Sequence, residues 1–162
     1  MTSANRPEIR KFGLGDVVGV RRCIVELQDY CRRLDPQIAD GESIADKYLE
    51  HLLSECRSTE GTLLVAEHEA EIVGLVCVFS KVRSTAVDEE EYQYAYISDL
   101  VVLPSHRKTG LGRALLEAAE RYAQSKGASL LRLSVISTNF SAREFYRDYG
   151  FNEKVVVVQK KI

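Results

Sequence analysis

Apolar residues recur at helical spacing in two stretches of the first third of the chain. The first stretch ends before Asp35-Pro36, and the second runs from Ile44 to Cys56 behind Ser43, a residue type suited to an N-cap. Each stretch predicts an amphipathic helix, and a short strand over Glu8 to Phe12 is expected before them. The apolar face of the first helix comprises Val20, Cys23, Ile24, Leu27, Cys31 and Leu34.

The middle of the chain carries runs of residues that favour strands. Thr62 to Ala66 and Ile72 to Phe79 are joined by a short polar link, which predicts an antiparallel hairpin. Tyr92 to Leu103 predicts a longer strand that ends at Pro104. The intervening segment, Ser84 to Glu91, is acidic at its end, and it is either a solvated loop or a region that attracts a cationic amine.

The last third of the chain alternates helical and extended patterns. An apolar helical face lies between Gly110 and Gly127, and Leu130 to Ile136 predicts a strand. Ser141 to Glu144 has the form of a capping box, which predicts the start of a short last helix. Val155 to Gln159 then predicts the final strand.

This order of elements predicts an α/β fold built on one mixed sheet. The strand–helix–strand unit from Tyr92 to Ile136 requires two parallel strands with a right-handed crossover, whereas the earlier hairpin is antiparallel. Helices are expected to cover the sheet. No repeat, low-complexity stretch or linker divides the chain, so one domain over residues 1–162 is expected.

Composition narrows the possible functions. Apolar residues make up 45% of the chain and charged residues 28%, and the formal net charge is −2. The chain therefore has no basic field to attract nucleic acid, and no apolar run approaches the roughly 20 residues that span a bilayer. The polar N-terminus lacks a signal-peptide core, so a cytoplasmic location is expected. The three histidines and four cysteines lack metal-ligand spacing, so no metal site is expected.

The most informative segment runs from Leu103 to Leu116, where a strand ends, a basic loop follows and a helix begins. Backbone N–H groups at a helix start have no internal partner, and the helix dipole adds about half a positive charge there. Gly110 and Gly112 let the backbone approach a ligand closely. The segment is either a pyrophosphate site or only a tight turn, and it lacks the remaining residues of a Walker loop or a dinucleotide fingerprint.

The loop Arg107-Lys-Thr-Gly-Leu-Gly112 resembles the Q/R-x-x-G-x-G/A signature of the GNAT superfamily of N-acetyltransferases. Asn139-Phe-Ser-Ala142, Phe145-Tyr146 and Gly150-Phe151 are similar to a second motif of that family, at the appropriate separation. The likeness extends over about residues 8 to 161, and the first third of the chain fits by element order alone.

The resemblance implies a fold in which the fourth and fifth strands separate and acetyl-CoA enters between them. It implies that the backbone amides of Lys108 to Gly112 contact the pyrophosphate, with Arg107 beside it. Main-chain groups of the fourth strand would hold pantetheine and the acetyl carbonyl. The implied cofactor-binding residues are Leu100, Val101, Val102, Arg107, Lys108, Thr109, Gly110, Leu111, Gly112, Arg113, Asn139 and Tyr146.

Two tyrosines are the candidate catalytic residues. By resemblance, Tyr146 is the general acid for the departing sulfur, and a phenol with a pKa near 10 suits that role; the alternative is a packing role. Some family members carry a glutamate where Ser98 stands, so the base is unassigned. Strand alternation predicts that Tyr96 shares a face with Ser98 and Leu100, where it can order a water that takes the proton. Asp99 is expected on the opposite face.

The resulting hypothesis is an acetyl-CoA-dependent N-acetyltransferase that acetylates a small-molecule amine or a protein amino group by direct attack in a ternary complex. Asn139 either binds the cofactor or organises its turn. A non-catalytic acyl-CoA-binding sensor and a nucleotide-binding regulator are the competing hypotheses. Dimers are common among proteins of the family that this chain resembles, so the resemblance also implies a possible homodimer.

Overall fold

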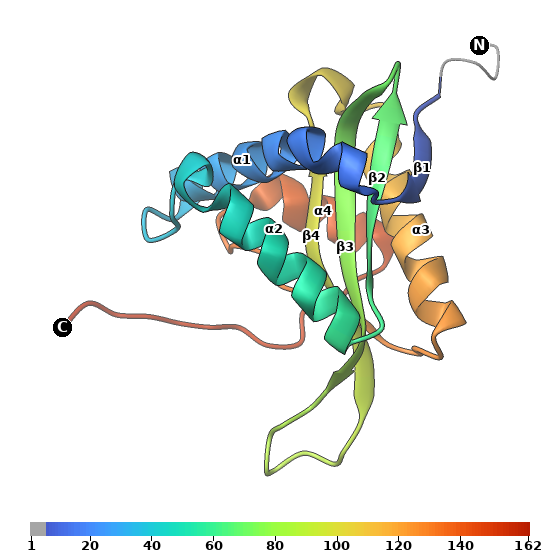
Figure 1. Cartoon of the computed structure of the whole chain (residues 1–162). Coiled ribbons are helices and arrows are strands. Elements are labelled where there is room, and N and C mark those ends of the chain that lie inside the picture. Colours follow the sequence, from blue (N-terminus) through green and yellow to red (C-terminus); the bar gives the residue numbers. More distant parts are fainter. Residues whose placement is uncertain (1–5) are drawn as a thin grey trace.

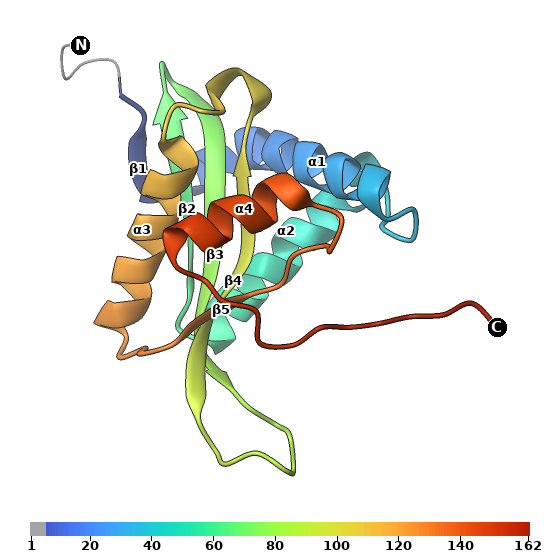
Figure 2. The same ribbon diagram turned by 180° about the vertical axis from the view of Figure 1, so that it is seen from behind.

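The structure, a computed structural model, describes residues 6–162. Figure 1 shows a central sheet with α1 and α2 across one face, and Figure 2 shows α3 and α4 on the other face. The elements are β1 (Glu8–Lys11), α1 (Val17–Leu34), α2 (Gly41–Ser58), β2 (Thr62–His68), β3 (Glu71–Arg83), β4 (Gln93–Val102), α3 (Leu111–Ser125), β5 (Leu131–Leu133) and α4 (Phe140–Tyr149). Short 3-10 turns cover Leu14–Asp16 and Pro104–His106.

The strands lie in the order β1-β2-β3-β4-β5. Neighbours from β1 to β4 are antiparallel, and β4 pairs with β5 in parallel across α3. The mixed α/β sheet, the antiparallel hairpin and the parallel strand–helix–strand unit are therefore confirmed.

Two apolar layers hold the helices to the sheet. Leu63 and Val65 of β2 pack with α1 and α2, whereas Leu64 and Ala66 pack with α3. This division follows from the strand geometry, in which successive side chains point to opposite faces. Both faces are buried, which explains why β2 and β3 are almost continuously apolar rather than alternating.

The N-caps of two helices differ from the predicted ones. Asp40, not Ser43, caps α2, and its Oδ1 accepts a hydrogen bond of 3.0 Å from the Ser43 amide. Asn139 caps α4 by accepting from the Ala142 amide at 3.2 Å, so Ser141 lies inside the helix. In both cases a side-chain oxygen accepts from an amide three residues later, which has no partner within the first turn of the helix.

The predicted strand over Val155 to Gln159 is wrong. Residues 152–162 form no regular element and are exposed, and the C-terminal segment runs away from the body of the molecule (Figures 1 and 2). The strand predicted from Leu130 to Ile136 is present only as Leu131–Leu133. A strand needs a neighbour to satisfy its backbone groups, and no strand pairs with the outer edge of β5 in the described part of the chain.

No helix within residues 6–162 combines the length and the apolar character that crossing a lipid bilayer requires.

Candidate active site

The parallel pair β4–β5 separates partway along its length. Pairing begins at Ala95 with Leu131 and ends at Ile97 with Leu133, while β4 continues to Val102. At the point of separation, Tyr96 Oη donates a hydrogen bond of 2.9 Å to Ser134 Oγ, just beyond the end of β5. The gap between the two strands therefore begins immediately after this bridge.

A β-bulge in β4 changes which side chains share a face. Cys77 of β3 pairs with Asp99 and the next residue pairs with Ile97, so Ser98 has no partner. A bulge residue shifts the alternation of the strand by one position. Consequently Tyr96 packs with the α1–α2 layer and Leu100 with the α3–α4 layer. The predicted common face of Tyr96 and Leu100 is wrong, as is the placement of Asp99 away from Tyr96.

Asp99 is the buried carboxyl group of this region, with 5% of its surface exposed. Tyr48 Oη of α2 donates a hydrogen bond of 2.8 Å to Asp99 Oδ1, and Ser98 Oγ donates to Oδ2. Burial raises the pKa of Asp99, and the two hydrogen bonds and the charge of His51 counteract only part of that rise. Strand alternation alone places Asp99 on the opposite face, because the bulge that turns it toward α2 leaves no mark in the residue pattern of the strand.

Tyr146 of α4 lies in the electrostatic field of the same carboxylate. Burial raises its pKa to about 12, and the charges of Asp99 and the Cys31 thiolate form add to the rise. Its ring packs against Phe145 and Phe151. Within residues 6–162 its hydroxyl has no hydrogen-bond partner, so the O–H remains available to a bound molecule. The predicted acid is thus a protonated phenol at neutral pH.

The loop before α3 presents free backbone amides. Lys108 has φ +59° and Gly110 has φ +86°, so the backbone turns sharply into the helix. Within residues 6–162, no acceptor takes a hydrogen bond from the amides of Lys108 to Gly112. A Cβ added at Gly110 would meet no atom within 4 Å, which leaves open space beside these amides. The residues present fit an anionic group such as a pyrophosphate.

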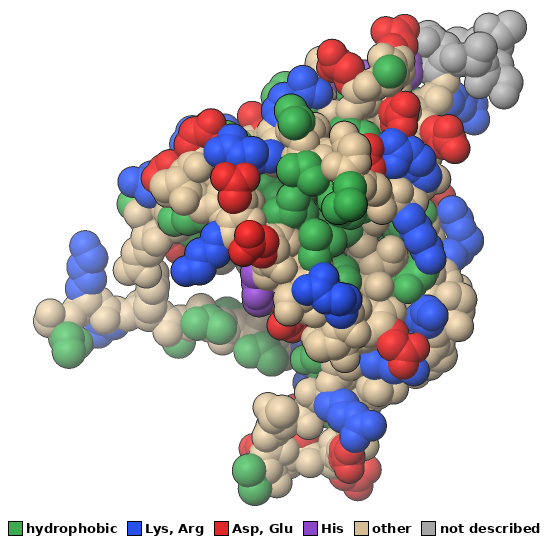
Figure 3. All heavy atoms as spheres, in the orientation of Figure 1, with side chains coloured by type: hydrophobic (Ala, Val, Ile, Leu, Met, Phe, Trp, Pro, Cys, Tyr) green, Lys and Arg blue, Asp and Glu red, His purple; other side chains and the backbone are tan. Residues whose placement is uncertain are grey.

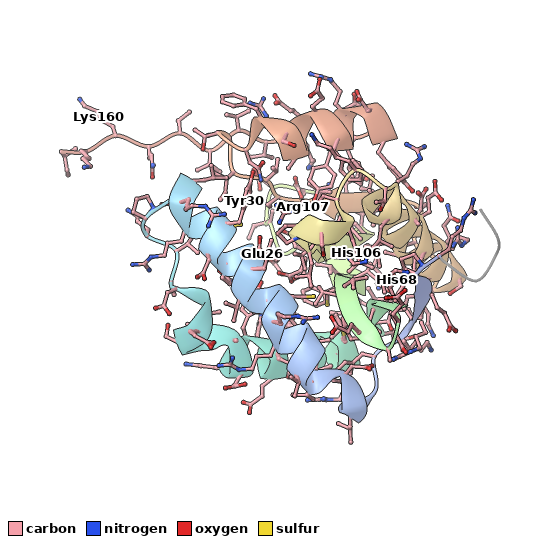
Figure 4. All side chains as sticks on the ribbon, turned by 90° about the horizontal axis from the view of Figure 1, so that it is seen from above. Glu26, Tyr30, His68, His106, Arg107 and Lys160 are labelled. Atoms are coloured by element: carbon pink, nitrogen blue, oxygen red, sulfur yellow. The ribbon has the colours of Figure 1, made fainter. Side chains whose placement is uncertain are left out.

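Arg107 is already engaged at this loop. Its Nε donates to the Val102 carbonyl oxygen and its Nη2 to Glu26 Oε1 of α1, each at 2.9 Å. The guanidinium also lies over the ring of Tyr30, 5.8 Å from its centroid. Figure 4 shows Glu26 and Tyr30 on α1 facing Arg107. Arg107 therefore ties α1 to the end of β4.

The remaining predicted cofactor residues surround the gap and the loop. Leu100 and Val102 are half-buried on the α3–α4 side, and Val101 is buried on the other side. Asn139 Oδ1 accepts from Tyr30 Oη at 3.3 Å as well as from its helix, which joins α1 to the start of α4. Arg113 lies over the Tyr149 ring. Their contacts with a cofactor stay a prediction.

His106 lies beside the loop and contacts a second histidine. Its Nε2 is 3.0 Å from His68 Nδ1, and its Nδ1 is 2.9 Å from Ser105 Oγ (Figure 4). Thr109 Oγ1 donates to the His106 carbonyl oxygen at 2.7 Å. These bonds shape the turn from which the free amides follow. Among the described residues no group of three or more His, Cys, Asp or Glu side chains is arranged to hold a metal ion.

The geometry agrees with the comparisons to known proteins. The sequence profile of the Acetyltransferase (GNAT) family matches residues 25–151. An uncharacterized N-acetyltransferase of Archaeoglobus fulgidus is 32% identical over 143 residues, which cover 86% of this chain and 88% of that protein. The chain belongs to the GNAT family of acetyltransferases, and the resemblance of its loop and second motif is confirmed.

Solved structures show the same fold. A putative acetyltransferase from Pyrococcus furiosus superposes with a TM-score of 0.75 at 28% identity, covering 96% of this chain and 99% of that one. The aminoglycoside N-acetyltransferase AAC(6')-Iy, solved in complex with CoA, gives 0.73 at 15% identity over 100% and 98% of the two chains. Alignments with the uncharacterized N-acetyltransferases YhfO of Bacillus subtilis and MJ1207 of Methanocaldococcus jannaschii span 60% and 30% of those proteins.

Proposed function

We propose that the protein is an acetyl-CoA-dependent N-acetyltransferase, formed by one domain over residues 1–162, that acetylates a primary amine by direct attack in a ternary complex. The observation that carries the proposal is the separation of β4 from β5 after Ile97, next to a turn whose amides from Lys108 to Gly112 are free. The gap suits an extended arm and the turn suits a diphosphate, and coenzyme A contains both of these parts.

Acetyl-CoA would supply the acetyl group as a thioester, with its diphosphate at Lys108 to Gly112. Backbone N–H groups along the free edge of β4 are fixed donors, suited to the charge that develops on a carbonyl oxygen. Tyr146 Oη keeps its proton at neutral pH and is the proton donor of the site. Tyr96 remains a candidate for ordering a water through its contact with Ser134.

Asp99 is the proposed anionic partner of the acceptor amine. The carboxyl group is buried, and its negative charge contributes to the raised pKa values of Tyr146 on α4 and Cys31 on α1. Burial raises its pKa because it disfavours the charged form, and a cationic amine would restore the favourable environment that burial removes. Asp99 would thus supply the carboxylate that some family members carry at the position of Ser98.

The test is the replacement Tyr146→Phe, compared with Tyr149→Phe three residues further on. Tyr149 Oη donates to Glu120 Oε2 at the surface end of α4, away from Asp99. We expect Tyr146→Phe to lower kcat by roughly 10²–10⁴-fold, the usual contribution of a general acid, and Tyr149→Phe to leave it nearly unchanged. CoA release with a panel of amines measures the rate, and calorimetry measures CoA affinity.

The alternative, a non-catalytic acyl-CoA sensor, predicts a different result. A sensor would bind CoA in both variants and in the wild type but would release none with any amine. The acceptor class is the least constrained part of the proposal. Small-molecule amines and protein amino groups both fit, and AAC(6')-Iy shows the fold in an aminoglycoside acetyltransferase. A cytoplasmic location is also proposed, in keeping with four free thiols, Cys23, Cys31, Cys56 and Cys77.

A further inference from the structure

Two thiols lie in contact between α2 and the sheet. The Sγ of Cys56, near the end of α2, is 3.5 Å from the Sγ of Cys77 on β3. Both residues are buried, with 8% and 0% of their surfaces exposed, and both thiols are free. The two sulfurs of a disulfide are about 2.05 Å apart, so an approach of about 1.5 Å would join this pair. Neither thiol has a role in the proposed acetyl transfer.

The other two cysteines, Cys23 and Cys31, do not form such a pair. They both lie on α1, and the rise of a helix over the eight positions between them is roughly 12 Å. Cys56 and Cys77 are 21 positions apart in the sequence, and the packing of α2 across the sheet brings them together (Figure 1). Their contact therefore joins a helix to the strand on which it packs.

Cys56 is the accessible member of the pair. It borders a surface groove of about 430 Å³ that Lys11, Arg57 and Lys126 also line, whereas Cys77 is fully buried. The hydrogen bond from Cys77 lowers the pKa of the Cys56 thiol, and the positive charge of Arg57 acts in the same direction. Since the thiolate is the reactive form of cysteine, Cys56 is the thiol that a small oxidant entering the groove would meet and oxidise first.

We propose that Cys56 and Cys77 form a modification site for hydroperoxides, in which Cys56 is oxidised first and Cys77 closes an intramolecular disulfide. The Cys56 thiolate attacks a peroxide oxygen, the O–O bond breaks, and the released hydroxide takes up a proton to leave as water, which gives a sulfenic acid. The sulfur of Cys77 then attacks the sulfenic sulfur, and its proton leaves with the hydroxyl group as a second water. Two thiols thus lose two electrons to one molecule of hydrogen peroxide.

The disulfide would fix α2 to the strand that pairs with Asp99. Cys77 is the register partner of Asp99, and Tyr48, which donates to Asp99, lies about two turns before Cys56 on the side of α2 that packs on the sheet. Oxidation would therefore hold the helix that supplies this hydrogen bond. Its effect on acetyl transfer rests on the proposed function, whereas formation of the bond does not. In a reducing compartment the bond would be transient.

The test treats the folded, reduced protein with a small excess of hydrogen peroxide, blocks the remaining thiols and maps the cysteines by mass spectrometry. Trypsin places Cys56 in residues 48–57 and Cys77 in residues 58–81, whereas Cys23 and Cys31 stay together in residues 23–32. We expect residues 48–57 joined to residues 58–81 within one chain, and dithiothreitol should separate them. The Tm should rise by roughly 5–10 °C, because a cross-link over 21 positions restricts the unfolded chain.

Single replacements test the order of the two steps. Cys77→Ser should stop at a sulfenic acid on Cys56, which dimedone traps, and Cys56→Ser should leave Cys77 reduced. Cys31→Ser is the matched control and should form the disulfide as the wild type does, because it removes neither sulfur of the pair. The proposal is overturned by a wild type that keeps all its thiols, by a bond that involves Cys23 or Cys31 or joins two chains, or by oxidation of Cys77 in Cys56→Ser. The wild-type map decides the matter even where circular dichroism shows that a variant is unfolded.

Discussion

Ser98 has no partner on β3, and this single unpaired residue determines which side chains of β4 reach the site. Without the bulge, Asp99 would face the α3–α4 layer and could not accept from Tyr48 on α2. With it, the carboxyl group enters the α1–α2 layer beside Tyr96. The residue pattern of β4 gives no sign of the bulge, because residues from Tyr94 to Val102 are buried or half-buried on both faces of the strand. Asp99 could therefore not be assigned from the pattern.

The buried carboxyl of Asp99 makes stability depend on pH. Burial raises the folded-state pKa above that of the unfolded chain, so the native state binds the proton more tightly. The free energy of unfolding should then fall as pH rises from the ordinary Asp range through the folded pKa. Asp99→Asn removes this fall, which amounts to about 1.4 kcal/mol for each unit by which the pKa is raised.

Urea unfolding of the wild type and Asp99→Asn between pH 4 and about 8 measures this difference. The variant should gain stability relative to the wild type as pH increases. Asp88→Asn, in the exposed loop before β4, is the matched control and should leave the wild-type curve unchanged. Parallel curves for the wild type and Asp99→Asn would contradict a raised pKa at this position.

At the scale of elements, the two glycines at the start of α3, Gly110 and Gly112, have different roles. Gly110 caps the helix with φ +86°, a conformation that costs other residues about 1–2 kcal/mol. Gly112 has an ordinary helical place, and a Cβ there would meet only Phe145 and Val102 at 3.8 Å, which is normal contact. The first glycine is needed by the fold, whereas the second is needed only if a ligand approaches the backbone.

Alanine at these two positions should therefore have opposite effects. Gly110→Ala should lower the free energy of unfolding by about 1–2 kcal/mol. Gly112→Ala should preserve or raise stability by up to about 1 kcal/mol, yet weaken CoA binding by about tenfold or more. Thermal unfolding and calorimetric titration with CoA measure the two quantities. Unchanged CoA affinity in Gly112→Ala would contradict the placement of the diphosphate at this turn.

The elements that the sequence predicted best are those fixed by local pattern. The helical faces of α1, α2 and α3 and the turn at Gly110 depend on spacing and backbone conformation within a few residues. The parallel pairing of β4 and β5 followed from the intervening helix, since a crossover permits little else.

The elements that were predicted wrongly depend on distant partners. The choice of Asp40 over Ser43 as the cap of α2 accompanies a close crossing, in which a Cβ at Gly41 would lie 2.5 Å from Val25 Cα. Val155 to Val158 are strand-forming residues, but no strand pairs with them within residues 6–162. β propensity describes a fit to a pleated sheet, so it does not by itself form a strand in a segment that pairs with no other strand.

At the scale of the whole molecule, a net charge of −2 gives no general attraction for an anionic cofactor. Acidic and basic side chains are interspersed on the face shown in Figure 3, and many of them are paired, as Arg21 is with Glu42. In the proposed function, the anionic diphosphate of CoA would therefore be bound by local, oriented groups, the free amides at the start of α3. The rest of the proposed affinity for CoA would come from the gap between β4 and β5.

This division predicts that CoA protects the protein against heat more than ADP does at the same concentration. ADP carries a diphosphate for the turn but has no arm for the gap, whereas CoA has both. At about 100 times its Kd, a ligand adds about 2.7 kcal/mol to stability, which for a chain of this size raises Tm by roughly 5–10 °C. Thermal shift with CoA, ADP, ATP and NAD measures the difference, and Gly112→Ala should reduce the CoA shift. Equal protection by ADP and CoA would mean that the gap holds no arm, and it would favour a nucleotide-binding regulator over an acetyltransferase.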